Sequence, residues 1–402
     1  MPATGDPALL AGLSFAVALF AFIVSAARLV EAAYAARMVP TLAAEKMPAT
    51  SSLSSLSVIV PARNEEEGLE VSLGSVLAQD HPALEVVLVD DRSSDGTGRI
   101  MDQMAAGKAH VRVLHVKALP EGWLGKSHAA YAGAELANGG WLLFTDADIR
   151  FRPDAMRRAV TYAERHDLDH LTLVPDLDLK GYWLRSAVAF FYVAFLLYRG
   201  YYRANVPSSK TGVGIGAFNL IRRCAYEEIG TYRAFALRPD DDLSLGARVK
   251  NLGLRQRLLG GHELLSVEWY DSLGALIRGV EKNVFPALNY SLPKVAGYFI
   301  GLLMVTVWPF AGAFLAEGPA RLFCLGAVAA QLGAYFIVNG FLGCRILPLA
   351  FGYPVCALLF AGVLVRSTVL ALLRGGIYWR GTFYPLSLLK SEKDGVTRHL
   401  GV

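Results

Sequence analysis

The chain has 402 residues, of which 54% are hydrophobic and 18% charged, and its mean hydropathy is +0.37. That is too apolar for an ordinary soluble domain, yet enough charge remains for a folded domain outside a membrane. The net charge of only +4 argues against a nucleic-acid partner. We therefore expect a soluble domain of roughly 200–250 residues joined to a few membrane-spanning helices.

A long apolar segment opens the chain. Residues 8–30 carry no charge before Arg28, and a helix of about 20 apolar residues is long enough to cross a bilayer. A secretory signal is the alternative, but it needs basic residues ahead of its apolar core, and none is present. Because Arg37 and Lys46 follow, the positive-inside rule places the next domain in the cytoplasm. We expect 8–30 to be a transmembrane anchor, followed by a Ser- and Thr-rich linker at 47–56.

Apolar strands alternate with helices from residue 57 onward. The acids that follow Pro61, Glu65 to Glu67, are expected in the first turn of a helix, where the helix dipole favours them. Continuous apolar runs separated by helices predict a doubly wound α/β domain with a mostly parallel sheet. The expected strands are 57–61, 85–89, 111–116 and 141–145.

Acidic pairs follow two of these strands, Asp90-Asp91 and Asp146-Ala147-Asp148. In open α/β sheets, ligands bind outside the carboxyl ends of the strands, so the two pairs are expected around one crevice. Carboxylates one residue apart suit a hard cation such as Mg²⁺ or Mn²⁺, although a turn or a helix cap is the local alternative. The dinucleotide and P-loop glycine patterns are absent from the sequence.

Two further features carry candidate chemistry. Lys126 follows a glycine and could meet a phosphate as a point charge, although a surface lysine is the simpler interpretation. The acidic run Asp240-Asp241-Asp242 precedes an apolar helix. Such a run can be an N-cap that the helix dipole favours, or it can supply a general base.

The remaining apolar segments complete the expected layout. Residues 186–198 are too few to span a membrane, so an interfacial helix is expected over 183–203, with a buried core helix as the alternative. Three crossings within 295–373 would put the C-terminus outside, whereas the basic tail, 374–402, favours the inside. A re-entrant or interfacial segment would remove this conflict. The three segments are 295–316, 320–342 and 347–373.

Five motifs in order resemble those of the family 2 glycosyltransferases, which have a Rossmann-like GT-A fold. The resemblance covers about residues 56–290, so we place the cytoplasmic GT-A domain at 57–290. The motifs are VPARNE (from Val60), VDDRSSDGT (from Val89), TDAD (from Thr145), GVGIGAFN (from Gly212) and DDL (from Asp241).

The resemblance implies a nucleotide-diphospho-sugar donor with uridine or guanosine as its base. Pro61, Arg63 and Glu65 would frame the base and the ribose. Asp91 would accept a hydrogen bond from the base, and Lys126 would assist at the diphosphate.

The resemblance also implies a metal site and a catalytic base. Asp148, with Asp146, would hold Mg²⁺ or Mn²⁺ on the diphosphate, and Asp146 would also face the ribose or sugar of the donor. Asp242 would deprotonate the acceptor hydroxyl, with inversion at the sugar. Asp241 and Asp240 remain alternatives because three acids in a row blur the register.

The QxxRW motif of the processive polysaccharide synthases in this family is missing from the sequence. We therefore expect transfer of a single sugar to a membrane lipid, as in glycosyltransferases of hopanoid, carotenoid or glycolipid synthesis, by an enzyme of the inner (cytoplasmic) membrane. A processive synthase and a non-catalytic nucleotide-sugar-binding membrane subunit are the alternatives.

Overall fold

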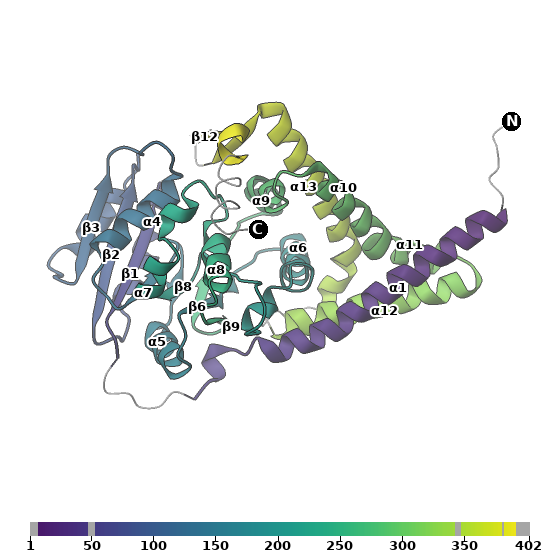
Figure 1. Ribbon diagram of the computed structural model, residues 1–402, viewed down its shortest axis with the longest axis horizontal. Coiled ribbons are helices and arrows are strands. Elements are labelled where there is room, and N and C mark those ends of the chain that lie inside the picture. Colours follow the sequence, from purple (N-terminus) through teal and green to yellow (C-terminus); the bar gives the residue numbers. More distant parts are fainter. Residues whose placement is uncertain (1–6, 47–52, 342–346, 380–381, 391–402) are drawn as a thin grey trace. The chain divides into compact units, whose positions relative to one another are not determined.

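The structure of the protein is a computed structural model that describes residues 7–46, 53–341, 347–379 and 382–390. The described chain forms two compact units (Figure 1). The first, here the sheet unit, comprises Met38–Asp178 and Tyr201–Trp269; the second, the helical unit, comprises 7–37, Leu179–Gly200 and Tyr270–Lys390. Most of the expected linker, 47–52, and the end of the basic tail, from 391, lie outside the described residues.

The central sheet of the sheet unit has seven strands in the order β3-β2-β1-β4-β8-β6-β9. Neighbouring strands are parallel, except that β8 is antiparallel to both β4 and β6. The predicted mostly parallel sheet is therefore confirmed. The strands are β1 (Leu56–Ala62), β2 (Leu84–Asp91), β3 (Val111–Val116), β4 (Trp141–Phe144), β6 (His170–Val174), β8 (Asn219–Arg222) and β9 (Gln256–Gly260); β5 (Arg150–Phe151), β10 (Leu265–Val267) and β7 (Asp176–Leu177) form a second, small sheet.

Helices cover both faces of the central sheet. Because side chains alternate along a strand, Val58 and Val60 of β1 face one apolar cluster and Ile59 faces the other. Both clusters are almost free of solvent, which makes three layers: helix, sheet and helix. On the first face lie α2 (Leu69–Leu77), α3 (Thr97–Ala105) and α5 (Ala155–Arg165); on the second lie α4 (Gly125–Leu136), α7 (Arg223–Glu228) and α8 (Asp241–Asn251).

The acids after Pro61 do not open a helix, and that prediction was wrong. Helix α2 begins at Leu69, after Gly68 with φ of +82°, and Glu65 to Glu67 lie in the preceding loop. The amide of Glu65 donates to Thr97 Oγ1 (2.9 Å) and that of Glu66 to Asp95 Oδ2 (3.2 Å). These partners from the loop after β2 satisfy N–H groups that a helix start would leave unpaired.

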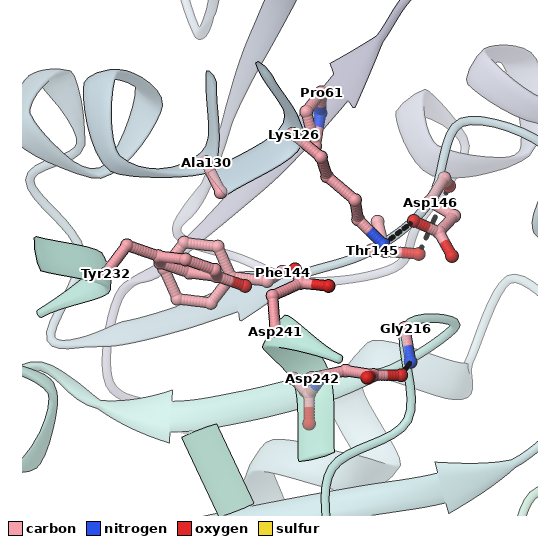
Figure 2. A pocket seen from close by; sticks show the side chains of 11 residues that line it. Pro61, Lys126, Ala130, Phe144, Thr145, Asp146, Gly216, Tyr232, Asp241 and Asp242 are labelled. Atoms are coloured by element: carbon pink, nitrogen blue, oxygen red, sulfur yellow. Dashed lines mark hydrogen bonds and ion pairs between the residues drawn. The ribbon is translucent and has the colours of Figure 1, made fainter. Parts of the chain in front are cut away.

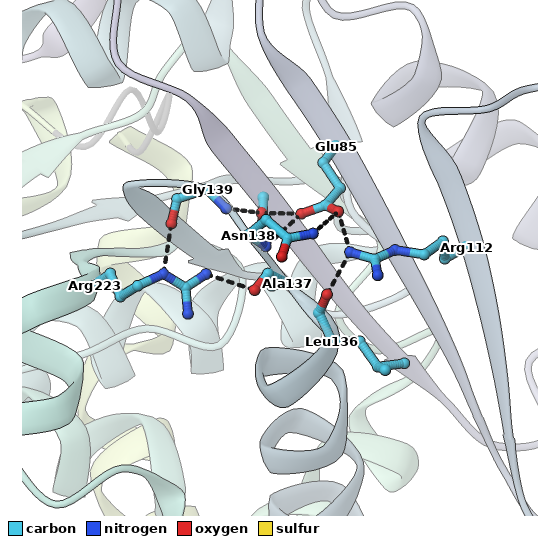
Figure 3. Close-up of polar contacts among 8 residues, drawn as sticks. Glu85, Arg112, Leu136, Ala137, Asn138, Gly139 and Arg223 are labelled. Atoms are coloured by element: carbon cyan, nitrogen blue, oxygen red, sulfur yellow. Dashed lines mark hydrogen bonds and ion pairs between the residues drawn. The ribbon is translucent and has the colours of Figure 1, made fainter.

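A polar network closes the edge of the sheet where β2 begins (Figure 3). The Glu85 carboxylate accepts hydrogen bonds from Ser57, from Arg112, and from the amide and side chain of Asn138 (2.7 and 3.0 Å). Arg223 donates to two carbonyl groups of the turn that contains Asn138. Burial opposes the charged form, but the hydrogen bonds from Ser57 and Asn138 outweigh it and lower the pKa of Glu85. The ionised carboxylate therefore stabilises the fold.

We expect the Glu85→Gln substitution to lower the free energy of unfolding of the sheet unit by about 1–3 kcal/mol at neutral pH. The folded-state pKa of Glu85 lies below its unfolded value, so this stabilisation is complete above the unfolded pKa. It should disappear as the pH falls through the folded pKa. Denaturant unfolding across acidic pH measures the difference. Glu67→Gln, at an exposed carboxylate, is the control and should behave like the wild type at every pH.

Within the described residues, four helical stretches are long and apolar enough to cross a membrane, at Ala11–Met38, Leu292–Leu315, Gly318–Gly340 and Ala350–Arg374. Polar contacts inside the helical unit join these helices: Gln331 donates to Ser25 Oγ (3.2 Å) and to the carbonyl of Val305 (2.8 Å). The helices are α1 (Pro7–Met38), α9 (Leu273–Ala287), α10 (Leu292–Gly301), a π-helical turn (Leu302–Val307), α11 (Trp308–Leu315), α12 (Gly318–Phe341) and α13 (Tyr353–Arg374); a hairpin of β11 (Gly376–Trp379) and β12 (Thr382–Pro385) follows.

The segment expected to be an interfacial helix belongs to the helical unit. It forms α6 (Tyr182–Val193) and a π-helical turn (Ala194–Tyr198). Only its start is exposed, at Tyr182 and Trp183, whereas Phe190 is 2% exposed and packs against Tyr353 of α13 (ring centroids 5.2 Å apart). Helix α13 therefore covers much of the apolar face of α6 within the helical unit, and the interfacial position of this segment stays a prediction.

Candidate functional site

The carboxyl ends of β1 and β4, the helix α4 and the start of α8 surround a small pocket in the sheet unit (Figure 2). The parallel pairing of β1 with β2 and β4 brings their ends to one edge, as expected from the sequence. Five predicted site residues line this pocket, namely Pro61, Lys126, Asp146, Asp241 and Asp242; the other lining residues are Ala130, Phe144, Thr145, Gly216, Asn219 and Tyr232.

Lys126 and Asp146 form an ion pair inside the pocket, with Nζ and Oδ1 2.6 Å apart (Figure 2). Lys126 lies in the first turn of α4, and Asp146 is the second residue after the end of β4. Burial disfavours the ammonium, but the charges of Asp146, Asp241 and Asp242 raise the pKa of Lys126 above its ordinary value. The pocket thus holds a permanent positive charge among acids, where it could meet a phosphate oxygen.

Asp148 lies on the loop that leaves β4. Desolvation by the surrounding protein, together with the charges of Asp146 and Glu65, raises the pKa of Asp148 to about 7. A divalent cation would relieve this repulsion. Among the described residues, three or more His, Cys, Asp or Glu side chains nowhere gather into a metal cluster. The two carboxylates fit Mg²⁺ or Mn²⁺, which are commonly held by one or two carboxylates plus phosphate oxygens and water.

The three consecutive acids have different surroundings. Asp240 precedes α8 and pairs with Arg238 (2.8 Å). Asp241 is 3% exposed, and its Oδ2 has no hydrogen-bond partner within the described part of the chain. Asp242 Oδ2 accepts from the amide of Gly216 (2.9 Å), and its Oδ1 accepts from the amide of Leu243 (2.7 Å). Only Asp241 and Asp242 line the pocket, so they are the candidates for a base.

Asp241 and Asp242, here called the pocket acids, bind protons more tightly than exposed carboxylates do. Desolvation and the charge of Asp241 raise the pKa of Asp242 to about 7, although Lys126 acts in the opposite direction. Burial also raises the pKa of Asp241, again against the effect of Lys126. A base whose pKa lies near the working pH is well matched to proton transfer.

The glycine-rich segment Gly212–Asn219 connects these groups, a role that its sequence motif did not predict. The carbonyl of Gly216 accepts from the amide of Asp146 (3.1 Å), while its own amide binds Asp242. A side chain at Gly216 would lie 2.6 Å from Asp146 Oδ2, and one at Gly212 would lie 2.0 Å from the carbonyl of Gly246 in α8. Glycine is needed at these positions because the backbone passes so close to its neighbours that no room is left for a side chain.

The residues expected to bind the nucleotide base of the donor lie at or just after the ends of β1 and β2. The loops that follow these two strands are hydrogen-bonded to each other. Arg63 and Glu65 follow β1, and Asp91 ends β2. Asp91 is buried and receives two hydrogen bonds from Arg92, at 2.7 and 3.0 Å. Asn64 and Arg92 both have a left-handed backbone, with φ of +54° and +56°. Such strain is maintained only by the surrounding structure and is frequent at ligand sites.

This sheet topology, with acidic loops at the strand ends, defines an α/β protein of the GT-A type. In agreement, the mannosyltransferase PcManGT from Pyrobaculum calidifontis, solved with GDP-Man and Mn²⁺, superposes with a TM-score of 0.50. The match covers 90% of this chain and 99% of that one at 17% identity, which shows the fold alone.

The family model named glycosyl transferase family 2 matches residues 57–230. The matched segment is therefore a domain of the family 2 glycosyltransferase type, and the protein is a glycosyltransferase. A 4,4'-diaponeurosporenoate glycosyltransferase of Staphylococcus haemolyticus (strain JCSC1435) is 25% identical over 264 residues, which cover 64% of this chain and 68% of that protein. The protein of the same name in Staphylococcus aureus (strain USA300) is 21% identical over 337 residues, which cover 83% and 88%.

Proposed function

We propose that the protein transfers a single sugar from a nucleotide-diphospho-sugar to a hydroxyl group of a membrane lipid, with inversion at the anomeric carbon. The observation that carries this proposal is the juxtaposition of Asp242 with the Lys126–Asp146 pair in one pocket at the strand ends. A proton acceptor and positive charge are the two things that such a transfer needs from the protein.

In this mechanism Asp242 takes the proton of the acceptor hydroxyl as its oxygen attacks the sugar. The amide of Gly216 orients the carboxylate during this step. Lys126 faces the diphosphate and stabilises the negative charge that develops on it. When bound at Asp146 and Asp148, Mg²⁺ or Mn²⁺ supplies further positive charge to the leaving group. Inversion follows from a single displacement, which requires only one catalytic base.

The loops after β1 and β2 are the proposed site for the base and ribose of the donor. Pro61 lines the pocket, and Glu65 lies close enough to Asp148 for its charge to raise the pKa of that carboxyl. Arg63 lies on the same loop as Glu65. Asp91, held by Arg92, would present its remaining acceptor capacity to the base. The nucleotide of the proposed donor is either uridine or guanosine diphosphate.

A lipid acceptor is supported by the names of the carotenoid-glycosylating relatives and by the four candidate spans. The helical unit also contains an apolar cavity of about 200 Å³, lined by Trp183, Leu273, Val355, Cys356 and Leu359. An apolar lining of this kind suits part of a lipid chain. Arg37 in the last turn of α1 and Lys46 after it support a cytoplasmic position for the sheet unit at the inner membrane.

Purified protein in detergent tests the proposal when it is incubated with Mn²⁺ or Mg²⁺, UDP- and GDP-sugars and a lipid extract. Mass spectrometry should detect a lipid that has gained one sugar. A long polymer would instead favour a processive synthase. Nucleotide-sugar binding without turnover over a broad panel of acceptors would favour a non-catalytic membrane subunit.

The rate of transfer should depend on pH through the pocket acids. Because the pKa of Asp242 is about 7, only about a tenth of it is ionised at about pH 6. We expect kcat/KM to rise with pH and to level off above about 7, and the apparent value belongs to Asp241 and Asp242 together. Initial rates at constant ionic strength measure this profile. A rate that stays flat through this range would show that neither acid titrates during turnover.

A further inference from the structure

Three buried polar side chains on adjacent strands of the central sheet form a network that includes the last residue of the glycine-rich segment. His170 of β6, Asn219 of β8 and Gln256 of β9 are 0%, 1% and 4% exposed. His170 Nε2 is 3.1 Å from Asn219 Oδ1, and Gln256 Nε2 is 2.7 Å from His170 Nδ1. Buried polar groups of this kind are costly unless every one of them is paired. The pairing of these three side chains therefore indicates a role in the surrounding structure.

The chemistry of the three side chains allows one pattern of donors and acceptors. An amide nitrogen only donates, so Gln256 donates to Nδ1, and Nε2–H of a neutral imidazole donates to the Asn219 oxygen. Burial lowers the pKa of His170 to about 4, which keeps the ring neutral at pH 7. The histidine thus holds the two amide side chains in fixed orientations.

Both amide side chains also accept hydrogen bonds from the backbone of the glycine-rich segment. Asn219 Oδ1 also accepts from the amide of Ile215 (3.2 Å), and Gln256 Oε1 accepts from the amide of Val213 (3.0 Å). Gln256 Nε2 additionally donates to the carbonyl of Gly246 in α8 (3.2 Å). The network therefore joins the glycine-rich segment to the helix that begins with the pocket acids.

We propose that His170, Asn219 and Gln256 are positioning residues for the transfer reaction: they fix the backbone of the glycine-rich segment against α8, so that the Gly216 amide holds Asp242 in its reactive orientation. This inference rests on the proposed function. Gly216 follows Ile215, and its carbonyl accepts from the amide of Asp146 while its amide donates to Asp242 Oδ2, so a shift of the segment moves both residues. Misplacement of a catalytic group by about 1 Å can cost about 10²-fold in rate.

The chain offers a matched pair of variants for the test. Gln256→Met removes three hydrogen bonds: to His170, to Gly246 and from Val213. Gln79→Met also removes three from a buried glutamine of the sheet unit, but its partners are the carbonyls of Ser75 and Arg152 and the amide of Met156. Both variants lose stability for the same reason, and only the first touches the glycine-rich segment.

We expect Gln256→Met to lower kcat by about 10–100-fold while the KM for the donor stays unchanged, because the loops proposed for the base and ribose are untouched. Gln79→Met should retain kcat at a temperature where both variants are folded. Gln256→Glu should recover only part of the loss: its carboxylate still accepts from the Val213 amide, but it cannot donate to the carbonyl of Gly246. Equal loss of kcat in both methionine variants, or wild-type kcat in Gln256→Met, would overturn the proposal.

Hydrogen exchange separates this inference from the proposed function. In Gln256→Met the peptide 212–218 should exchange faster, because the Val213 amide loses its acceptor. In Gln79→Met that peptide should exchange at the wild-type rate. Absence of sugar transfer by the wild type would refute the proposed function, whereas unaltered exchange in Gln256→Met would refute the network by itself.

Discussion

The Asp242→Asn substitution should lower kcat by about 10²–10⁴-fold, the usual contribution of a positioned general base. The amide keeps the size of the carboxylate and can still accept the hydrogen bond from Gly216, but it cannot take up the proton of the acceptor. Binding of the donor should change little, because Asp242 is proposed to contact the acceptor. Single-turnover rates and calorimetric titration with the nucleotide measure the two quantities separately.

Two further substitutions complete this experiment. Asp80→Asn, at an exposed ion pair with Arg157 on the surface of the sheet unit, is the control and should leave kcat unchanged. Asp241→Asn distinguishes the two pocket acids. If Asp241→Asn abolishes transfer while Asp242→Asn remains at the wild-type rate, then Asp241 is the base and our assignment is wrong.

The Asp148→Asn substitution should raise the concentration of Mn²⁺ or Mg²⁺ needed for half-maximal rate by at least about 10–100-fold, the loss seen even for partners further from a metal. It removes a carboxylate that suits a hard cation but leaves the Lys126–Asp146 pair in place. Metal titrations of the rate, with Mn²⁺ and Mg²⁺ in turn, provide the measurement.

The matched control for the metal site is Asp154→Asn. Asp154 is a partly exposed carboxylate of the sheet unit that pairs with Arg158 (2.6 Å). Its substitution should leave the metal requirement unchanged. An Asp148→Asn variant that is half-saturated at the wild-type metal concentration would remove Asp148 from the proposed ligand set.

Local patterns predicted much of the sheet unit. The run Val111–Val116 is a strand with the predicted bounds, and β1 and β2 begin one residue before their predicted starts. Apolar runs of five or six residues between helices leave the chain few alternatives to buried parallel strands. The position of the pocket was also predictable, because β1, β2 and β4 are parallel and bring their carboxyl ends to one edge of the sheet.

Other features depend on partners that are distant in sequence. Glu65 and Glu66 looked like the first turn of a helix until the loop after β2 supplied partners for their amides. The burial of α6 depends on the aromatic contact of Phe190 with Tyr353, from segments far apart in the chain. No local pattern contains such information.

The sequence by itself determined that this chain joins an α/β sheet to apolar helices and that acids follow its strands, because hydrophobic periodicity and strand direction are local properties. Only the tertiary structure decided which acids share a pocket and what surrounds them. The pKa of a carboxylate depends on desolvation and on charges within a few ångströms. Asp242 owes its raised pKa first to burial in the folded protein and then to the charge of Asp241, against the effect of Lys126, which lies more than a hundred residues away in the chain.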